Sequence, residues 1–240
     1  MIKFENISKS FGKLTVFDKL NLEIGESGIV SILGPNASGK TTLIKMLLGM
    51  VIPNNGNIIY QNKSILKDWN YRKDISYLPQ IAHFPENLRV KELISLVKNI
   101  RQQDSDEKEL IDIFKLGNSL DKKLGHLSGG TVQKVNLTLC LMFDSPVIVL
   151  DEPSNGLDPI ALVNLKELIS REKEKGKLIL LTTHIMSLVE ELSERMVFLL
   201  EGNVVFDGSN EKLKTMYQAT NIEKALANLL ENGNVENIKI

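Results

Sequence analysis

The chain has 240 residues, of which 42% are hydrophobic, and this is enough for one large globular domain with a smaller lobe. Its 29 basic and 30 acidic residues give a formal net charge of −1, so we expect no direct nucleic-acid partner. The sequence has no run of about 18 apolar residues, and its first residues lack the apolar core of a signal peptide. We therefore expect a cytoplasmic protein.

Cysteine and histidine usage argues against disulfides and structural metal sites. Cys140 is the only cysteine, which excludes an intramolecular disulfide and fits a reducing compartment. It lies in an apolar stretch, so we interpret it as a small buried hydrophobic residue. The histidines His83, His126 and His184 are not spaced like metal ligands, and we predict no structural metal site.

The first third of the chain combines two kinds of β-structure. Residues 2–7, 15–24 and 57–60 are short, β-prone and separated by turn signals, which predicts a small antiparallel sheet. Residues 29–33 form an apolar run that ends at a loop rich in Gly, Pro and Asn, and residues 42–48 are predicted to be helical. Strand, loop and helix therefore follow one another in the order in which phosphate-binding loops occur.

The middle of the chain, from Arg89 to Phe143, has a helical pattern of apolar residues. We predict that residues 85–143 form a helical subdomain inserted between the apolar strands. The acidic and basic residues from Arg101 to Glu109 are interpreted as its solvated connector.

Two further apolar runs and an amphipathic segment follow. Residues 147–150 and 178–181 are apolar throughout, which is typical of parallel strands that are covered on both faces. In the predicted helical tail, about residues 210–240, apolar residues recur at helical spacing, and they are Ile222, Ala225, Leu226, Leu229 and Leu230. We favour packing of this helix on its own domain over a membrane or partner helix.

These elements predict an α/β fold in a single domain, residues 1–240. A parallel core sheet is flanked by helices and joined by an N-terminal antiparallel β subdomain and the inserted helical subdomain.

A glycine-rich sequence follows the apolar run 29–33. It satisfies the pattern G-x-x-x-x-G-K-[ST] with Gly34, Pro35, Asn36, Ala37, Ser38, Gly39, Lys40 and Thr41. Glycines let backbone amides curl around a triphosphate, and the helix that begins near Thr42 adds the positive end of its dipole. Lys40 can reach the β- and γ-phosphates, and the Thr41 hydroxyl can ligate Mg²⁺. The strand–loop–helix context predicts a P-loop site for ATP.

Two acidic residues follow the apolar run 147–150. Asp151 stands at the end of this strand, where ligands of parallel sheets gather, so we expect it to reach the metal ion. Glu152 comes next and is suited to polarise a water molecule in line with the γ-phosphate. An isolated Asp-Glu pair would be read as an acidic turn, but the complete phosphate loop favours the catalytic interpretation.

The segment from Leu127 to Lys134, LSGGTVQK, resembles the signature sequence of ATP-binding cassette (ABC) proteins. The resemblance covers nearly the whole chain, and the motifs occur in the family's order. Besides the phosphate loop, the signature and the Asp-Glu pair, the residues at family motif positions are Phe11, Gln80, Asp158 and His184. Ala37-Ser38 and Asn155 depart mildly from the commoner residues, and neither departure removes a catalytic group.

The resemblance implies a mechanism for two paired cassettes. Each ATP lies between the phosphate loop of one chain and the signature of the other, so a symmetric dimer is expected. Ser128, Gly129 and Gly130 form a second anion cradle before a helix. The resemblance also implies roles for four other residues. Phe11 stacks on adenine, in preference to a core position, and Gln80 senses Mg²⁺ and the attacking water and touches the membrane partner. His184 holds the γ-phosphate and Glu152, and Asp158 communicates across the dimer.

Among cassette proteins, a transporter ATPase with its motor on a separate chain fits this length best. The partner would be a separate transmembrane permease, which holds the chain on the inner face of the cell membrane. The segments Phe84–Leu88, Thr183–Ser187 and Val197–Gly202 are similar to the ATPase of the copper-processing (nitrous-oxide-reductase maturation) exporter. The chain has no Cys or Met cluster, so nothing suggests that it handles copper itself.

Three alternative functions fit the sequence less well. A soluble cassette ATPase that regulates a ribosome- or nucleic-acid-associated process is disfavoured by the single cassette and the lack of a basic stretch. A scaffold with little turnover is disfavoured by Glu152 and His184. A GTPase is disfavoured because Asn62-Lys63-Ser64-Ile65 lacks the Asp of a guanine-reading motif.

Overall fold

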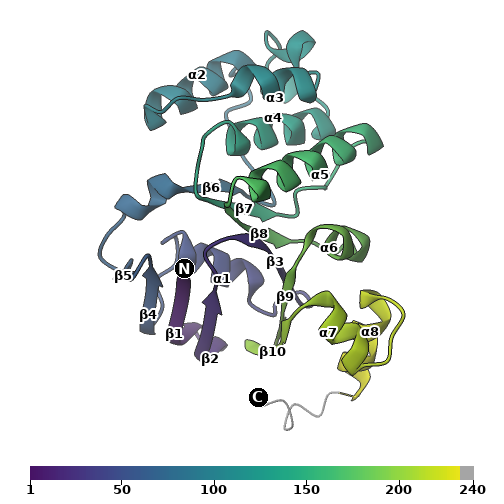
Figure 1. Ribbon diagram of the computed structural model, residues 1–240. Coiled ribbons are helices and arrows are strands. Elements are labelled where there is room, and N and C mark those ends of the chain that lie inside the picture. Colours follow the sequence, from purple (N-terminus) through teal and green to yellow (C-terminus); the bar gives the residue numbers. More distant parts are fainter. Residues whose placement is uncertain (233–240) are drawn as a thin grey trace. The chain divides into compact units, whose positions relative to one another are not determined.

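The computed structural model describes residues 1–232, in two compact units (Figure 1). The terminal unit comprises residues 1–72 and the described residues from 178 onward, and the middle unit comprises residues 73–177.

The terminal unit contains both types of sheet predicted for it. Its strands are β1 (Ile2–Phe11), β2 (Leu14–Ile24), β3 (Gly28–Leu33), β4 (Asn55–Tyr60), β5 (Lys63–Ser64), β8 (Leu178–Thr182), β9 (Arg195–Leu200) and β10 (Asn203–Gly208). Its helices are α1 (Lys40–Leu47), α6 (Met186–Leu192), α7 (Asn210–Met216) and α8 (Ile222–Asn232). The helix after the phosphate loop therefore begins two residues earlier than the sequence pattern predicts.

The antiparallel sheet of the terminal unit has the strand order β2-β1-β4-β5. Ile2 pairs with Ile24 on one side and with Tyr60 on the other, which places β1 between its two neighbours. Alternate residues of these strands are buried, including Phe4, Ile7 and Phe17. One face of the sheet therefore packs inward, and the predicted N-terminal antiparallel sheet is confirmed.

The parallel strands of the terminal unit centre on β3. This strand pairs in parallel with β8 on one side and β9 on the other, and β10 pairs antiparallel with β9. From Ile29 to Leu33 every residue of β3 is buried, as is every residue of β8. Burial of whole strands explains why these segments read as unbroken apolar runs rather than as alternating patterns.

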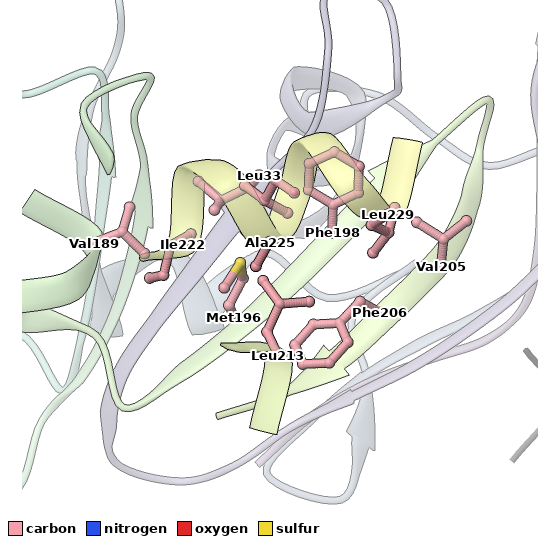
Figure 2. Close-up of a cluster of buried hydrophobic side chains, with 11 residues drawn as sticks. Leu33, Val189, Met196, Phe198, Val205, Phe206, Leu213, Ile222, Ala225 and Leu229 are labelled. Atoms are coloured by element: carbon pink, nitrogen blue, oxygen red, sulfur yellow. The ribbon is translucent and has the colours of Figure 1, made fainter. Parts of the chain in front are cut away.

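Helix α8 packs on its own unit, as we predicted from its spacing. Ile222, Ala225, Leu226 and Leu229 are buried in a cluster with side chains from other elements of the terminal unit (Figure 2). Those other members are Leu33, Val189, Met196, Phe198, Val205, Phe206 and Leu213. Leu230 is about half exposed. The part of the predicted tail from 233 to 240 lies outside the described residues.

The middle unit is predominantly helical around a pair of parallel strands, β6 (Ile75–Leu78) and β7 (Val147–Asp151). Its α-helices are α2 (Val90–Arg101), α3 (Glu107–Ile113), α4 (Gly129–Leu141) and α5 (Pro159–Glu174). Short 3-10 helices are η2 (Gly117–Ser119) and η3 (Leu124–His126), and η1 (Asn70–Asp74) crosses the boundary at residue 73. Helices α2 to α4 lie within the predicted range 85–143, and the limits of a helical subdomain stay a prediction.

The expectation of a purely solvated connector from Arg101 to Glu109 is wrong. The guanidinium of Arg101 donates to Ile75 O at 2.7 Å and to the hydroxyls of Ser76 and Ser145 at 3.2 and 3.1 Å. It also lies over the Phe143 ring, 4.8 Å from the centroid. These partners are remote in sequence, so a charge-rich local pattern gave no sign of them.

Cys140 is buried, and burial raises the pKa of its thiol to about 12. The interpretation of this residue as a buried hydrophobic residue is therefore confirmed. Within residues 1–232, no helix is long and apolar enough to span a membrane. The same part of the chain contains no group of three or more His, Cys, Asp and Glu side chains that could hold a metal ion.

Candidate nucleotide-binding site

The glycine-rich loop of the terminal unit connects β3 to α1, as its motif requires. Gly34 has φ 146° and Gly39 has φ 107°, conformations that side chains rarely adopt. A Cβ atom on Gly34 would lie 2.1 Å from Leu199 O, and one on Gly39 would lie 2.5 Å from the Phe17 ring. Both glycines are therefore required by backbone geometry and by close packing.

Lys40 begins α1 and folds back over the loop. Its Nζ atom donates to Gly34 O at 2.6 Å and to Pro35 O at 2.8 Å. The Ser38 hydroxyl is buried and has no hydrogen-bond partner among the described residues. A buried hydroxyl without a partner costs about 1–3 kcal/mol, which an anion bound in the loop would offset. The loop therefore fits a phosphate-bearing ligand.

The remaining loop residues face solvent or continue the helix. Asn36 and Ala37 are exposed, and Ala37 has φ 65°. Thr41 is exposed in the first turn of α1, and Thr42 is half-buried next to it. Both hydroxyls thus stand at the helix N-terminus, where the helix dipole favours negative charge.

Phe11 ends β1 and is not part of the core. Its side chain is 49% exposed, and Lys9 Nζ lies 4.8 Å from its ring centroid. The alternative that Phe11 is a core residue is therefore wrong. An exposed aromatic face beside a cation is free to stack on a planar ligand.

His184 lies at the same sheet edge as the phosphate loop. Strand β8 runs parallel to β3, and Ser31 pairs with Leu181. In this register, the carboxyl ends of β3 and β8 lie at the same edge of the sheet. His184 comes two residues after the end of β8 and therefore lies at that edge. The Thr183 hydroxyl accepts a hydrogen bond from Ile185 N at 3.1 Å, which shapes the turn that presents His184.

In the middle unit, three predicted site residues lie at or just after the ends of the two parallel strands: the catalytic Gln80 and Glu152 and the metal ligand Asp151. Leu78 of β6 pairs with Leu150 of β7, so Gln80 and the Asp151–Glu152 pair leave the same edge. Gln80 is exposed, whereas Asp151 and Glu152 are 4% and 5% exposed. Burial, and then the negative charge of Asp151, raises the pKa of Tyr77 to about 12.

Glu152 has an unusual backbone conformation. Its φ of 53° lies in the left-handed region, which costs a residue with a side chain about 1–3 kcal/mol. Strain of this kind persists where surrounding contacts enforce it, and functional sites are a common location. The backbone thus turns sharply at the residue that we predict to activate water.

The signature segment begins α4 as a capped helix terminus. Ser128 is the N-cap, and its Oγ accepts a hydrogen bond from Thr131 N at 3.4 Å and lies 2.9 Å from Thr131 Oγ1. Ser128 and Gly129 are exposed, and a Cβ on Gly129 would meet nothing within 4 Å. This terminus is therefore open to a ligand or to another chain.

The segment 153–158 packs against the start of α4. A Cβ on Gly130 would lie 2.5 Å from Gly156 O, and Gln133 Nε2 donates to Pro153 O at 3.0 Å. Lys134 Nζ lies 2.5 Å from Asp158 Oδ2. Sequence reasoning assigned no role to Gln133 and Lys134, although their spacing from Gly130 on one helix face was a usable signal.

Asp158 also caps α5. Its Oδ1 accepts a hydrogen bond from Ala161 N at 2.9 Å, and Pro159 occupies the first helical turn. The bond from Lys134 and the amide of Ala161 lower the pKa of Asp158.

The predicted residues gather into two sets, one in each unit. Phe11, the loop from Gly34 to Thr42 and His184 belong to the terminal unit. Gln80, Asp151, Glu152, Ser128–Gly130 and Asp158 belong to the middle unit.

Comparison with known proteins supports this set of motifs. Residues 17–155 match the family described as ABC transporter. The lantibiotic transport ATP-binding protein SrtF of Streptococcus pyogenes is 31% identical over 225 residues, which cover 90% of this chain and 96% of that protein. The Nod factor export ATP-binding protein I of Burkholderia lata is 33% identical over 218 residues, which cover 88% of this chain and 72% of that protein.

Solved structures confirm the predicted fold class. The ATP-binding subunit of an ABC transporter has a TM-score of 0.88 at 26% identity, covering 96% of this chain and 99% of that one. A dimeric cassette in a post-hydrolysis state, bound to ADP and Pi, has a TM-score of 0.78 at 25% identity, covering 87% of this chain and 98% of that one.

Proposed function

Because this chain belongs to the ABC transporter family and is an ATPase of the cassette type, we propose that it is the motor subunit of an exporter. Its membrane-spanning part is a separate permease chain. One observation carries the proposal: a complete set of cassette motifs occurs at strand and helix ends in a chain that resembles exporter ATPases over nearly its whole length. Similarity to the Nod factor export ATP-binding protein supports export rather than uptake.

The phosphate loop of the terminal unit holds the triphosphate of ATP. The backbone amides of Asn36, Ser38 and Gly39 surround it, and Lys40 exchanges its two carbonyl partners for the β- and γ-phosphates. Phe11 stacks on the adenine from the end of β1. The cradle that Cβ atoms on Gly34 and Gly39 would fill supports this assignment.

Hydrolysis depends on the residues that follow β6, β7 and β8. By the family resemblance, Thr41, Asp151 and Gln80 are the residues that would provide oxygen atoms for Mg²⁺, and the bound ion would neutralise charge that develops on the phosphates. Glu152 accepts a proton from the attacking water, and His184 holds the γ-phosphate and orients Glu152. Burial of Glu152 supports this role, because it allows the attacking water to be held apart from bulk solvent.

Two copies of the chain complete each site. Ser128, Gly129 and Gly130 of one copy bind the γ-phosphate held by the phosphate loop of the other copy, and Asp158 contributes to the interface. The open helix terminus at Ser128 supports this arrangement, because its amide groups and dipole suit an anion. The symmetric pair has two identical sites.

The dimer is tested with Glu152→Gln, which keeps ATP binding but removes the proton acceptor. We expect ATP to convert this variant into a stable dimer, measured by light scattering with and without nucleotide. Glu167→Gln, an exposed position of α5, is the matched control and should remain monomeric or exchange rapidly. A monomeric Glu152→Gln protein at saturating ATP would contradict the sandwich.

A cavity beside Gln80 is the place that we assign to the permease. It has a volume of about 300 Å³ in the middle unit, and its lining includes Pro79, Phe84, Val97 and Asn136. The Oδ1 atom of Asn136 is buried without a hydrogen-bond partner among the described residues. Exposed apolar residues flank the lining residues in sequence, and they are Ile81, Leu96 and Ile100. Exposed apolar side chains next to the lining residues favour a protein partner, which would hold the chain peripherally at the inner face of the membrane.

A pull-down distinguishes the transporter from the soluble alternative. The Glu152→Gln protein is isolated from detergent-solubilised native membranes, and co-purifying chains are identified by mass. Val97→Glu is included to place a charge in the cavity, with Glu167→Gln as a neutral control. A stoichiometric polytopic protein that is lost in Val97→Glu supports the proposal. Recovery with ribosomal or other soluble partners alone would move the function to a cassette regulator.

A narrower proposal concerns the exporter branch. The segments Phe84–Leu88, Thr183–Ser187 and Val197–Gly202 support a relation to the copper-processing exporter, in which the permease selects the cargo. Deleting the gene for this chain should then lower the activity of a copper enzyme outside the cytoplasm. A wild-type level of that activity, with defective export of a peptide or lipid, would place the chain in another branch.

A further inference from the structure

The start of α4 touches the segment 153–158 through one helix face. Gly130, Gln133 and Lys134 stand at positions i, i+3 and i+4, which are neighbours on a helix surface. Their partners are Gly156, Pro153 and Asp158, respectively. We call these three contacts the α4 clamp. They span the stretch of chain that begins immediately after Glu152.

The contact at Gln133 is the buried member of the clamp. Gln133 is 8% exposed, and its amide donates to the carbonyl of the residue that follows Glu152. Pro153 has no backbone N–H to donate, and the backbone bond that closes the turn at Glu152 is a long one, from Asn155 N to Glu152 O at 3.3 Å. The hydrogen bond from Gln133 therefore restrains the turn in which Glu152 holds its left-handed conformation.

The contact at Lys134 is the more exposed member. The side chains of Lys134 and Asp158 are 21% and 49% exposed, and exposed ion pairs contribute little to folding stability. Asp158 is held at the same time by Ala161 N, so its carboxylate joins α4 to the start of α5. The Lys134–Asp158 pair adds little stability, but it links these two helices to the turn after Glu152. We therefore interpret the pair as one that positions this turn and not as one that stabilises the fold.

We propose that Gln133 and Lys134 are positioning residues, which set Glu152 in response to the nucleotide that the signature of the same chain binds. This rests on the proposed dimer. Ser128 and Gly129 begin the helix that carries both residues, so an anion at its N-terminus is two turns or less from the clamp. Each copy would thus report the ATP of its partner's phosphate loop to its own catalytic carboxylate.

The first test separates turnover from binding. Lys134→Gln removes the charge, and we expect kcat for ATP to fall about 10-fold while KM stays within about twofold. Lys134→Arg keeps the ion pair and should retain kcat, because a cavity of about 390 Å³ beside Lys134 and Asp158 has room for the larger side chain. Lys91→Gln, which removes the exposed pair with Asp121, is the control and should leave kcat unchanged.

The second test asks whether the pair acts as a unit. If it does, the double variant Lys134→Gln/Asp158→Asn should have a kcat no lower than that of the slower single variant. Gln133→Met, which fills the same space without the donor, should lower kcat by a similar factor. Because Gln133 is buried, the substitution could also lower the stability of the protein. The melting temperature of the Gln133→Met variant is therefore measured, and kcat is compared with the wild type well below that temperature.

The outcomes also separate this inference from the dimer itself. Lys134→Gln in the Glu152→Gln background should still dimerise with ATP, because the clamp positions Glu152 and does not bind nucleotide. If the wild-type chain forms no ATP-dependent dimer, the proposed function fails first. If it dimerises and Lys134→Gln keeps the wild-type kcat, or Lys134→Arg loses as much activity as Lys134→Gln, the positioning role is overturned.

Discussion

The phosphate loop and the signature are both glycine-containing turns that lead into a helix, but they are built differently. In the phosphate loop, Gly34 and Gly39 have positive φ and no room for a Cβ, and Lys40 closes over the loop's own carbonyls. In the signature, Gly129 has open space around it. A Cβ atom on Gly130, by contrast, would lie 2.5 Å from Gly156 O, in the segment that follows Glu152. One turn is a preformed cradle, whereas the other is an open helix terminus, which in the proposed dimer would be completed by the second chain.

The largest expected effect comes from blocking the open turn. Ser128→Arg fills the exposed helix terminus, so we expect ATP affinity of the single chain to be unchanged and turnover to fall about 1,000-fold, the scale of a trans-acting group in phosphoryl transfer. Fluorescent-nucleotide titration and phosphate release measure the two quantities. Ser95→Arg, an exposed position on α2, is the matched control. Normal hydrolysis by Ser128→Arg would refute the composite site.

Removing the cation of the closed turn should act on binding itself. Lys40→Ala is expected to weaken ATP binding about 100-fold, because the phosphates lose their main positively charged partner in the loop. Calorimetric titration measures the affinity. Lys45→Ala, on an exposed face of the same helix, should bind ATP like the wild type. Equal affinities for Lys40→Ala and wild type would remove Lys40 from the site.

A pair of glycine substitutions compares the two turns directly. Gly34→Ala forces a Cβ towards Leu199 O at a positive φ, and we expect it to lower the free energy of unfolding by about 3 kcal/mol. Gly129→Ala meets no neighbour and should leave stability within about 0.5 kcal/mol. Urea unfolding of both variants provides the measurement. Similar losses for the two would show that the turns are not built differently.

A smaller effect involves Glu172 of the middle unit, away from both turns. Its burial would raise the pKa, but bonds from Lys175 at 2.8 Å and from Lys177 outweigh it, and the pKa is lowered below the ordinary 4.5. The carboxylate therefore adds stability above pH 4.5, and this contribution is lost as the pH falls through the lower folded-state pKa. Glu172→Gln should cost about 1 kcal/mol at pH 7.

The pH dependence of stability distinguishes the contribution of ionised Glu172 from an effect of side-chain packing. The gap in unfolding free energy between wild type and Glu172→Gln should narrow as the pH falls from 5 to below 4, measured by urea unfolding. Glu167→Gln, on the exposed face of the same helix, should show no gap at any pH. A gap that is constant with pH would mean that the ionised form of Glu172 contributes nothing.

Much of this architecture could be predicted because the signals are local. Burial on both faces leaves β3 and β8 as continuous apolar runs. The short β-prone segments between turn signals at the start of the chain indicate the antiparallel sheet. The phosphate loop is recognisable because φ and packing leave only glycine at fixed spacing. For Phe11, the preference for a stacking position over a core position came from the family resemblance, and its exposed side chain fits that preference.

What the sequence did not reveal depends on contacts between distant residues. Arg101 looked like part of a solvated connector, but its partners Ile75, Ser76 and Ser145 lie about 25 to 45 residues away. The α4 clamp joins residues that are about 20 to 26 apart, and no local periodicity indicates which carbonyl Gln133 meets. The positive φ of Glu152 likewise has no signal in the local sequence, because a glutamate does not itself favour that conformation.

The packing of α8 has a consequence for how this chain is shortened or extended in the laboratory. Its apolar face covers Leu33, the last residue of β3, from which the phosphate loop departs (Figure 2). A chain cut before Ile222 would uncover this cluster and loosen the strand end that anchors the nucleotide cradle. Helix α8 is therefore part of the smallest unit that can be expected to bind ATP, although none of its residues belongs to a catalytic motif.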